Sequence, residues 1–257
     1  MSTNWIVVLT RNNLELTQGA VRSFRAQDIG GGVSIMVIDN GSTDATAAWL
    51  NTQKDLYVVY HRPARSVAES WNTALRWLFE RKWISPSKAI GPEADYALVV
   101  NNDVVLRPDT YRWLVEDGGG FVTAVGTRER AKIENHLPPD PEKKRPHPDF
   151  SCYLIRRSTW NTVGPFDENF KIAYVEDQDY HLRMHRAGVH AEALELPFLH
   201  LGAQTVKAVP TEDRKRILEQ AAKNREYFKQ KYGFDSGGEE YYQQFGTPPP
   251  PEPDARI

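Results

Sequence analysis

The chain has 257 residues, of which 40% are hydrophobic and 11% aromatic, enough to bury the core of one large domain. Its 32 Lys and Arg against 34 Asp and Glu leave a net charge of −2, which disfavours a nucleic-acid binder because no global positive field attracts a polyanion. The single cysteine, Cys152, excludes an intramolecular disulfide framework, and no run of about 20 apolar residues predicts a membrane span. Because the N-terminus does not resemble a signal peptide, we expect a cytoplasmic protein.

Four apolar runs in the first half predict strands, at residues 5–10, 33–39, 56–60 and 96–100. Each run is continuously apolar rather than alternating, as is typical of strands covered by helices on both faces. Apolar residues between the runs recur at helical spacing, among them Leu14, Val21, Phe24, Trp71, Leu75 and Leu78. This alternation predicts an α/β fold with a mostly parallel, Rossmann-like central sheet flanked by helices.

The second half of the chain is less regular. Residues 127–148 are charged and rich in proline, and they predict a long mobile loop. The proline-rich segment 246–257 cannot form a packed element. The elements predicted between these segments are a strand at 150–155, a helix that opens near Glu176, a strand at 189–195 and a helix at 211–232.

Polar clusters follow the four predicted strands of the first half, at residues 10–13, 39–44, 61–65 and 101–105. The carboxyl ends of parallel strands meet at one edge of a sheet, which is where ligands bind in open α/β folds. We therefore expect the functional site at this edge.

Two nucleotide-binding arrangements compete for the first half. A dinucleotide-binding domain also carries an acid at the end of its second strand, here Asp39, but it needs a glycine-rich turn after the first strand. That turn reads TRNNLE and has no glycine, and no P-loop is present. The alternative is a divalent metal that carboxylates hold at a strand end and that binds the phosphates. Asn101, Asn102 and Asp103 form a turn of this type after the fourth strand.

Six motifs occur in order along the chain: VVLTRNN, VIDNGSTDAT, VVNNDVVLRP, VGPFDENF, YVEDQDYHLRMHRAG and HLGAQT. Over residues 5–205 they resemble family 2 of the inverting glycosyltransferases, which have the GT-A fold, and most of all its rhamnosyltransferase-type branch. The resemblance implies that Asp39 binds the nucleotide base, that Asp103 binds the metal and the diphosphate, and that Asp177 is the catalytic base. Where many members have Asp, this chain has Asn101, which leaves Asp103 as the carboxylate of that turn.

The resemblance also implies one GT-A domain at residues 1–232. Its nucleotide-binding half would be 1–106, its acceptor and catalytic half 107–205, and its C-terminal helix 206–232. We expect residues 233–257 to be a disordered Pro-rich tail.

An ionised Asp39 can only accept hydrogen bonds, so it matches the imide N3–H of uracil or thymine and the N1–H and amino group of guanine. Cytosine presents an acceptor at N3, so a UDP-, dTDP- or GDP-sugar is a better donor than a CDP-sugar. Alternatively, Asp39, Asn40, Ser42 and Asp44 form an Asx-type turn that caps a helix beginning near Ala45. In both interpretations Asp44 is the cap.

Asp103 is the predicted metal ligand, and His200 and the side-chain oxygen of Asn101 are candidates to complete the set. Oxygen-rich ligation together with a substrate diphosphate suits Mn²⁺ or Mg²⁺ rather than zinc. The alternatives are ordinary turn chemistry for the Asn-Asn-Asp sequence and a structural role for His200.

Glu176 and Asp177 are the predicted catalytic acids. One of them, by preference Asp177, would deprotonate the acceptor hydroxyl as it attacks the anomeric carbon from the face opposite the leaving group. The helix dipole should keep Asp177 ionised, and the alternative is that these acids merely favour the start of a helix. His181 and His185 resemble a zinc pair, but Leu182 replaces the glutamate of the metalloprotease motif, so we expect no zinc there.

Further site residues follow from their positions in the predicted fold. Asp149 and Phe150 are candidates for the acceptor floor, and Cys152 is expected to be a small core residue rather than a nucleophile. The candidates for the nucleotide pocket, besides Asp39, are Thr10, Arg11, Asn12, Arg65 and Asn102.

These interpretations predict a metal-dependent inverting glycosyltransferase that moves a sugar from a nucleoside-diphosphate sugar to a hydroxyl of a glycan or of a protein Ser or Thr. The alternatives are a DNA-modifying glycosyltransferase, a nucleotidyltransferase and a non-catalytic carbohydrate-binding protein. A nucleotidyltransferase is disfavoured because its glycine-rich, basic signature after the first strand is absent. The basic helix 211–232 could contact a membrane that carries a lipid-linked acceptor, but we expect it to pack on the domain through Ile217, Leu218 and Phe228.

Overall fold

The computed structural model describes residues 4–80, 94–135, 137–140, 143–145, 147–201 and 211–247. Its first half alternates strands with helices: β1 (Trp5–Thr10), α1 (Leu14–Arg25), β2 (Ser34–Asp39), α2 (Thr46–Thr52), β3 (Leu56–Tyr60), α3 (Val67–Glu80) and β4 (Tyr96–Asn101). The strands are parallel in the order β3–β2–β1–β4. Thr10 lies opposite Asp39, and Leu9 lies opposite Asn101. The four predicted strands are thus confirmed, and their carboxyl ends meet at one edge.

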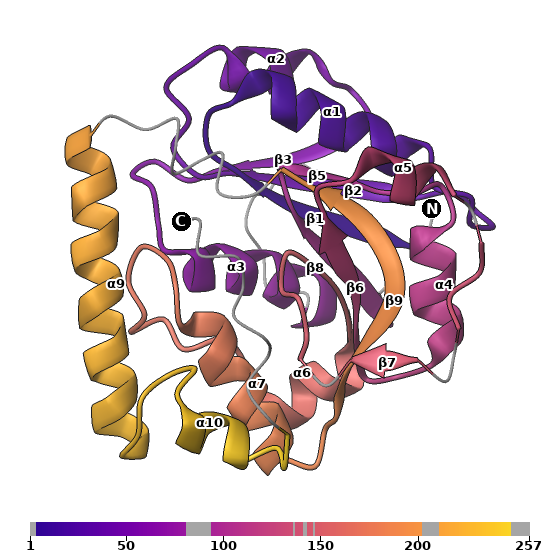
Figure 1. Cartoon of the computed structure of the whole chain (residues 1–257). Coiled ribbons are helices and arrows are strands. Elements are labelled where there is room, and N and C mark those ends of the chain that lie inside the picture. Colours follow the sequence, from indigo (N-terminus) through magenta and orange to yellow (C-terminus); the bar gives the residue numbers. More distant parts are fainter. Residues whose placement is uncertain are drawn as a thin grey trace.

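The second half continues the sheet with mixed pairing. Its elements are β5 (Val104–Val105), α4 (Thr110–Asp117), β6 (Phe121–Thr127), α5 (Arg130–Glu134), β7 (Lys144–Arg145), β8 (Cys152–Arg156), α6 (Arg157–Val163), α7 (Glu176–Arg186), β9 (Ala191–His200), α9 (Thr211–Tyr232) and α10 (Glu239–Gln243). The sheet runs from β4 through β8, β6 and β9 to β5, with β8 antiparallel to both neighbours and β6 parallel to β9. Figure 1 shows α1 and α2 on one side of the sheet and α3, α6 and α7 on the other.

Alternate residues of the central strands fill two separate cores. Ile6 of β1 packs with Phe24 of α1 on one face, whereas Val7 packs with Leu75 of α3 on the other. All four side chains are fully buried, and each contributes about 1.5–3 kcal/mol on the scale of apolar transfer. Both faces of β1 are dry, which is why its sequence is a continuous apolar run.

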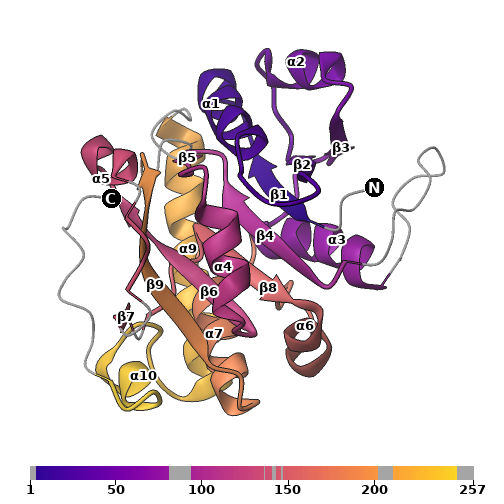
Figure 2. The ribbon, with the colours of Figure 1, turned by 90° about the vertical axis from the view of Figure 1, so that its right-hand side faces the viewer.

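The C-terminal segment forms a third core against α7. Phe228 and Tyr241 are buried there beside Val175 and Leu182. Figures 1 and 2 both place α10 at the end of the molecule away from α1 and α2. The predicted tail at 233–257 is therefore wrong for residues 233–247, because the aromatic residues of this segment pack on α7 and α9. Residues 248–257 lie outside the described residues.

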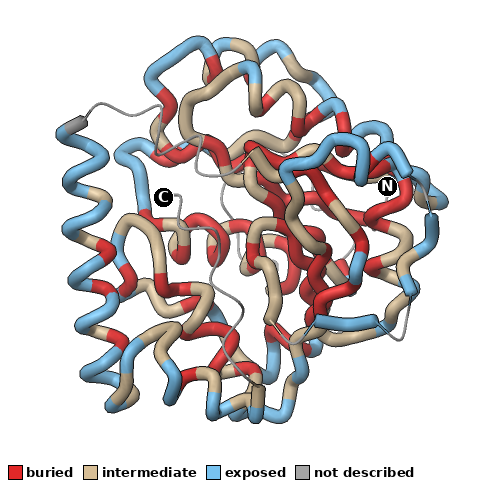
Figure 3. The backbone as a smooth tube through the Cα atoms, viewed as in Figure 1, coloured by how far each residue is buried: buried red, intermediate tan, exposed pale blue. Residues whose placement is uncertain are grey.

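Helix α9 confirms the predicted helix at 211–232, but it packs differently from the prediction. Phe228 is fully buried and Ile217 is half-buried, whereas Leu218 is 46% exposed because it lies on the solvent side. Figure 3 shows that most of α9 is exposed and that its buried positions lie along one side. Within the described chain, no helix combines the length and the apolar character that crossing a membrane requires.

Two predictions for the region after α4 need correction. The loop expected at 127–148 contains the short helix α5 and the two-residue strand β7, which pairs with β9 through Lys144 and Leu194. Elements of this length leave no readable hydrophobic period in a charged, Pro-rich segment. The strand expected at 189–195 begins at Ala191 and continues to His200, because β9 pairs with β6 beyond an irregularity between Thr123 and Val125.

Candidate active site

The carboxyl ends of β1 and β4 are joined by a buried hydrogen-bond group that contains two predicted nucleotide-binding residues. Oγ1 of Thr10 lies 2.7 Å from Oγ1 of Thr17, and Nδ2 of Asn102 donates to these two hydroxyls at 3.1 and 3.3 Å. Thr10 and Asn102 are 1% and 4% exposed. Their side chains therefore fix the two strand ends to each other.

Asn12 joins the loop after β1 to the loop after β2. Its N–H donates to Oγ of Ser42 at 2.8 Å, and its Oδ1 accepts from the N–H of Thr43 at 2.7 Å. Asn12 and Asn13 have φ angles of 60° and 59°, in the left-handed region that asparagine tolerates better than most residues. The two asparagines thus make a turn for which a dinucleotide-binding domain uses glycine. Beside them, Nε of Arg11 is buried without a hydrogen-bond partner among the described residues.

Asp39 is completely buried at the end of β2, and both of its carboxylate oxygens have partners. Oδ1 accepts from the N–H of Ser42 at 3.0 Å, and Oδ2 accepts from Nη2 of Arg62 at 2.7 Å. The side chain of Arg62 is 45% exposed, so its guanidinium covers the carboxylate from the solvent side. Sequence reasoning missed Arg62, although its place in the polar cluster at 61–65 was an available signal.

The neighbouring loops are shaped by backbone hydrogen bonds. Oδ1 of Asp44 accepts from the N–H of Thr46, the first residue of α2, at 2.9 Å, but the N-cap position is Ala45, so Asp44 stands one residue before the cap position predicted for it. Asn40 exchanges two hydrogen bonds with the backbone of Arg65, at 2.8 and 2.7 Å, and the Arg65 side chain is exposed. Burial lowers the pKa of His61 to about 4, so this histidine is neutral at physiological pH.

The two predicted metal ligands Asp103 and His200 lie side by side. Nε2 of His200, the last residue of β9, is 3.5 Å from Oδ1 of Asp103. The pairing of β5 with β9 places Val104 opposite His200, and the N–H of Leu201 donates to the carbonyl oxygen of Asp103 at 3.0 Å. Burial alone lowers the pKa of His200, but the hydrogen bond and charge of Asp103, together with the charge of Asp149, raise it above its usual value.

Asp103 and His200 fit a divalent metal ion that also takes ligands from outside the protein. A carboxylate oxygen and an imidazole nitrogen 3.5 Å apart can bind one ion once the imidazole is neutral. Asn101 ends β4 next to Asp103 and is half-buried. Within the described ranges no group of three or more His, Cys, Asp or Glu side chains could hold an ion alone. Two protein ligands leave the other positions of a divalent ion to further oxygens, as a diphosphate can supply.

Asp149 lies near the Asp103–His200 pair, and its charge also acts on the acids of α7. Its Oδ1 accepts from the N–H of Ser151 at 2.9 Å, and its Oδ2 accepts from the N–H of Gly126 at 3.2 Å. A Cβ atom on Gly126 would come within 2.9 Å of Oδ2 of Asp149 and 3.4 Å of Cβ of His200, so the close packing here requires glycine. Besides the effects of burial, the charge of Asp149 raises the pKa values of His200 and Asp177.

Phe150, the other predicted acceptor-side residue, belongs mainly to the core. It is 9% exposed, and its ring lies 5.0 Å from that of Phe121 and 5.3 Å from that of Tyr153, between centroids. Cys152 is fully buried in the neighbouring strand, and burial raises its pKa well above the usual value, as expected for an inert core thiol.

Glu176 and Asp177 open α7, as predicted. Glu176 is 5% exposed, and its Oε2 is buried without a hydrogen-bond partner in the described part of the chain. Asp177 is half-buried, and its Oδ1 accepts from the N–H of Gln178 at 2.8 Å. Burial raises the pKa of both carboxyl groups, and the charge of Asp177 raises that of Glu176 further. Burial therefore opposes the effect of the helix dipole at Asp177, and its ionised state stays a prediction.

Sequence reasoning missed a set of buried polar atoms near these acids. The hydroxyls of Tyr153 and Tyr180 and Nε1 of Trp71 are buried and have no hydrogen-bond partner among the residues described. The rings of Trp71 and Tyr153 pack edge to face with centroids 5.6 Å apart. Burial raises the pKa of Tyr153 well above its usual value, and the neighbouring Tyr180 and acids add to this. Such atoms need water or a ligand hydroxyl as a partner.

His181 and His185 contact the C-terminal segment. The ring of His181 stacks on Phe245 with centroids 4.1 Å apart, and its Nδ1 lies 3.0 Å from the hydroxyl of Tyr241. The ring of His185 meets the edge of the same Phe245 at 4.9 Å. Burial lowers the pKa of His181 to about 3, so this residue acts as a neutral aromatic partner.

A cavity of about 540 Å³ lies beside Gly126. Its lining includes Gly126, which contacts Asp149, together with residues of α5, β9 and the segment between α5 and β7. The basic side chains of the lining have acidic partners: Lys132 with Glu129 at 2.7 Å, Lys143 with Asp140 at 3.4 Å, Arg145 with Glu195 at 3.5 Å and Arg107 with Asp109 at 2.7 Å. The cavity is therefore polar without a net excess of free positive charge.

Comparison with known proteins identifies the family. Residues 5–172 match the family model described as "Glycosyl transferase family 2". The mannosyltransferase PcManGT from Pyrobaculum calidifontis, solved in complex with GDP-Man and Mn2+, is similar with a TM-score of 0.57 and 19% identity over 86% of this chain and 61% of that chain. S. aureus TarS 1-349 is similar with a TM-score of 0.55 and 16% identity, over 90% of this chain and 74% of that chain. Its complex with UDP-GlcNAc has a TM-score of 0.56 and 15% identity, over 86% of this chain and 66% of that chain. No curated protein sequence matches the chain.

At these identities the solved structures show a common fold, which is the GT-A fold predicted from the sequence motifs. The chain spans 61% of the length of PcManGT. The matches do not single out the rhamnosyltransferase-type branch. The matched residues contain most of the sheet and end four residues before Glu176. On the strength of this match, which covers well over half of its length, the chain belongs to glycosyl transferase family 2.

Proposed function

We propose that the protein is a metal-dependent inverting glycosyltransferase that moves a sugar from a UDP-, dTDP- or GDP-sugar to a hydroxyl of a glycan or of a protein Ser or Thr. The observation that carries this proposal is the position of Asp149. Its carboxylate packs against Gly126 beside His200, and its charge acts on Asp177. The proposed metal ligands and the proposed base would thus both lie near Asp149, an arrangement that a non-catalytic carbohydrate-binding protein does not need.

The donor nucleotide would bind at the carboxyl ends of β1 and β2. Asp39 can accept a hydrogen bond from a base N–H once Arg62 turns away from it, and the freed guanidinium can then pair with the diphosphate. Nε of Arg11 is a further donor that lacks a partner in the described fold. The structures solved with GDP-Man and with UDP-GlcNAc support a nucleoside-diphosphate sugar as the class of donor.

The metal would be held by Asp103 and His200, with the side-chain oxygen of Asn101 as a third candidate ligand. Mn²⁺ and Mg²⁺ suit such a site when the diphosphate supplies further oxygens. The bound ion would offset the charge that builds up on the leaving nucleoside diphosphate. The Mn2+ in the PcManGT structure supports this assignment.

Asp177 would act as the general base. Burial and the charge of Asp177 raise the pKa of Glu176 well above its usual value, so we assign the negative charge of the pair to Asp177. A raised pKa brings this carboxylate nearer to the working pH, which makes it a better proton acceptor. It would take the proton of the acceptor hydroxyl as that oxygen attacks the anomeric carbon opposite the leaving group.

The acceptor would enter by way of the cavity beside Asp149. Since the basic side chains of the cavity are paired with acids, the cavity suits a neutral hydroxyl compound better than a polyanion. This disfavours the DNA-modifying alternative, and the family match disfavours a nucleotidyltransferase. The sugar is a hexose or a deoxyhexose, and resemblance to the rhamnosyltransferase-type branch makes deoxyhexosyl donors part of any test.

The experiment that tests the proposal is a hydrolysis screen of UDP-, dTDP-, GDP- and CDP-sugars with Mn²⁺ and with a chelator. We expect at least one of the first three donors to be hydrolysed, and only with the metal present. Preferred hydrolysis of a CDP-sugar would contradict the role of Asp39. Carbohydrate binding without hydrolysis of any donor would favour the non-catalytic alternative.

A further inference from the structure

The loop directly before the acids has a backbone conformation that its residue types disfavour. Ile172, Tyr174 and Val175 have φ angles of 59°, 77° and 80°. This is the left-handed region, which glycine adopts at no steric cost and β-branched residues rarely adopt. Such conformations persist only where surrounding contacts enforce them, and they cluster at functional sites. Val175 immediately precedes Glu176, so whatever holds this loop also places the acids.

One buried side chain of α9 supplies these contacts. Nδ2 of Asn224 donates to the carbonyl oxygens of Lys171, Ala173 and Tyr174 at 2.9, 3.0 and 3.0 Å. Its Oδ1 accepts from the N–H of Lys171 at 3.2 Å and from Nε2 of Gln220 at 3.0 Å. Asn224 is 1% exposed. These partners also fix the orientation of the amide, because a flip would oppose donor to donor and acceptor to acceptor.

The loop is tied on its other side to the start of α3. The N–H of Val67, the first residue of α3, donates to the carbonyl oxygen of Ile172 at 2.8 Å. Ser66 and Glu69 cap this helix reciprocally, since Oγ of Ser66 accepts from the N–H of Glu69 at 3.2 Å and Oε2 of Glu69 accepts from the N–H of Ser66 at 2.9 Å. The hydrogen bond from Val67 therefore connects the loop to the capped N-terminus of α3, next to the loop that carries Arg65.

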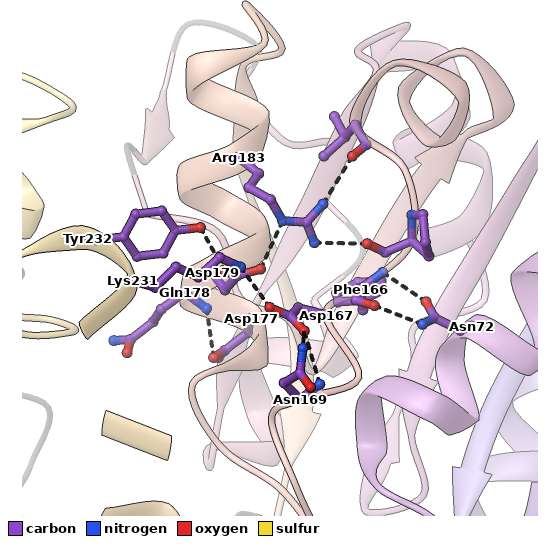
Figure 4. Close-up of polar contacts among 12 residues, drawn as sticks. Asn72, Phe166, Asp167, Asn169, Asp177, Gln178, Asp179, Arg183, Lys231 and Tyr232 are labelled. Carbon is purple, nitrogen blue, oxygen red and sulfur yellow. Dashed lines mark hydrogen bonds and ion pairs between the residues drawn. The ribbon is translucent and has the colours of Figure 1, made fainter. Parts of the chain in front are cut away.

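The first turn of α7 is held to α9 as well. Asp179 is fully buried, and its Oδ1 accepts from Nζ of Lys231 and from the hydroxyl of Tyr232, both at 2.7 Å. Its Oδ2 accepts from Nε of Arg183 at 2.8 Å. Figure 4 shows Asp177 on the same turn of the helix as Asp179, with these contacts drawn. The two acids thus stand between a fixed loop and a fixed helical turn.

We propose that residues 171–175 are a positioning loop for Glu176 and Asp177 and that Asn224 is the residue that holds it in place. This proposal rests on the proposed transferase function. Asn224 does not act on the substrate; it sets the direction in which the two carboxyl groups leave the backbone. Asn224 lies on α9, beyond the segment that matches the family model. With this role for Asn224, helix α9 helps to position the acids of the site.

The kinetic test compares Asn224→Ala with a matched change on the same helix. Tyr227→Phe removes the hydrogen bonds between Tyr227 and the side chains of Asp167 and Asn169 but leaves the loop carbonyls paired. Asn224→Ala should lower kcat by about 10- to 100-fold with the KM for the donor unchanged, because a small misplacement of a reacting group has a cost of this order. Tyr227→Phe should keep near-normal kcat.

Amide hydrogen exchange separates the loop assignment from the proposed function, because it needs no substrate. The N–H groups of Val67 and Asp179 donate to the carbonyl oxygens of Ile172 and Val175. In Asn224→Ala both amides should exchange faster than in the wild type, since opening of the loop exposes them. In Tyr227→Phe their exchange should be unchanged.

Val67→Pro provides a second variant in case Asn224→Ala does not fold. Proline is well tolerated at the first helical position, and here it removes the N–H that holds Ile172. It should reduce kcat in the same direction as Asn224→Ala. Normal exchange in Asn224→Ala, or loosened exchange with normal kcat in either variant, would overturn the proposal. A wild type that transfers no sugar would refute the proposed function, while exchange would still decide whether Asn224 holds the loop.

Discussion

Asp39 and Arg62 show how a single buried charge can be kept ready for a ligand. A carboxylate taken out of water needs hydrogen bonds or a positive charge, and Asp39 has both, from the N–H of Ser42 and the guanidinium of Arg62. The N–H donors of a nucleotide base can satisfy the same oxygen that Arg62 satisfies. The guanidinium also lies 5.5 Å from the centroid of the Tyr60 ring and donates to the carbonyl oxygen of His61 at 2.8 Å, and its 45% exposure lets a diphosphate reach it.

Arg62→Gln is predicted to weaken binding of UDP or GDP by about tenfold or more, the usual worth of a hydrogen bond to a charged group. Binding of the nucleosides uridine and guanosine should not weaken, because they have no phosphate for Arg62 to meet and no longer have to displace its guanidinium from Asp39. Calorimetry on the four ligands measures the difference, with Arg22→Gln on the exposed face of α1 as the control. Equal losses for the nucleoside and its diphosphate would contradict the assignment of Arg62 to the phosphates.

At the scale of elements, α7 is fixed to α9 by an ion-pair network. Nζ of Lys231 lies 2.7 Å from Oδ2 of Asp167 and 2.7 Å from Oδ1 of Asp179. Burial raises the pKa of Asp167, but the hydrogen bond from Lys231 and further hydrogen bonds lower it overall, to about 2. Burial lowers the pKa of Lys231, but its two acidic partners raise it overall. The network, drawn in Figure 4, joins the loop before α7, α7 itself and α9.

Lys231→Met is predicted to lower the free energy of unfolding by about 2 kcal/mol, because it removes one of the two cations that pair with the buried Asp179 and leaves Arg183 as the other. The value is below that of a fully buried pair because Lys231 is partly exposed. Lys229→Met is the matched control, since Lys229 pairs only with the exposed Asp235 in the described chain and should change stability little. Urea unfolding measures both variants. Equal destabilisation by Lys231→Met and Lys229→Met would contradict a stabilising role for the ion-pair network of Lys231.

The same elements show what the sequence could and could not predict. The acids near Glu176 indicated the start of α7, and Pro210 just before residues 211–232 indicated the start of α9. The contact between them was beyond the sequence, because Asp179 and Lys231 are 52 positions apart and a lysine in a charged helix normally faces solvent.

In the candidate site, too, some residues could be predicted from the sequence and others could not. Asp39 and Asp103 were predicted from their places at the ends of parallel strands and from motifs that resemble family 2, although turn chemistry was an alternative for both. Asn224 and Tyr153 were missed, because a polar residue in a helix or a tyrosine in a strand carries no sign of what it will meet. The role of such residues depends on which distant carbonyl or acid packs against them, and only the structure shows this.

At the scale of the whole molecule, the sheet brings together groups from both halves of the chain. The parallel half carries Asp39 and Asp103, while β9 returns from the second half to place His200 against Asp103. Two histidines, His61 and His181, are buried in different parts of this fold. Burial lowers the pKa of His61 to about 4 beside the nucleotide loops, and burial lowers that of His181 to about 3 beneath the C-terminal segment.

These two histidines are therefore predicted to destabilise the fold as the pH falls from about 6.5 to 4.5. In this window the unfolded chain protonates its histidines, whereas His61 and His181 stay neutral in the fold, so the unfolded state binds more protons. Each such histidine costs about 1.4 kcal/mol per pH unit. The groups that face His181 are His147, His185 and Tyr241.

The measurement is the pH dependence of the unfolding free energy in the wild type and in His181→Phe. Phenylalanine keeps a ring to stack on Phe245 but cannot take up a proton. The unfolding free energy of the variant should fall less steeply with decreasing pH, by about 1.4 kcal/mol per pH unit, which corresponds to one proton. The contributions of all other titratable groups are the same in both proteins and cancel in the comparison. His190→Gln, at an exposed histidine, should leave the slope unchanged. Identical slopes for the wild type and His181→Phe would contradict the neutral state of His181.

The central claim is that Asp177 removes the proton of the acceptor while Asp103 holds the metal, and one experiment on Asp177→Asn and Asp103→Ala tests it most directly. Mn²⁺-dependent binding of the nucleoside diphosphate and sugar transfer are measured for both variants and for Glu176→Gln. Asp177→Asn should bind Mn²⁺ and nucleotide near normally and lose about 10²- to 10⁴-fold in transfer, the usual scale for general base catalysis. Asp103→Ala should lose both. Near-full transfer by Asp177→Asn together with loss in Glu176→Gln would move the base by one residue, and full transfer by both would contradict the account.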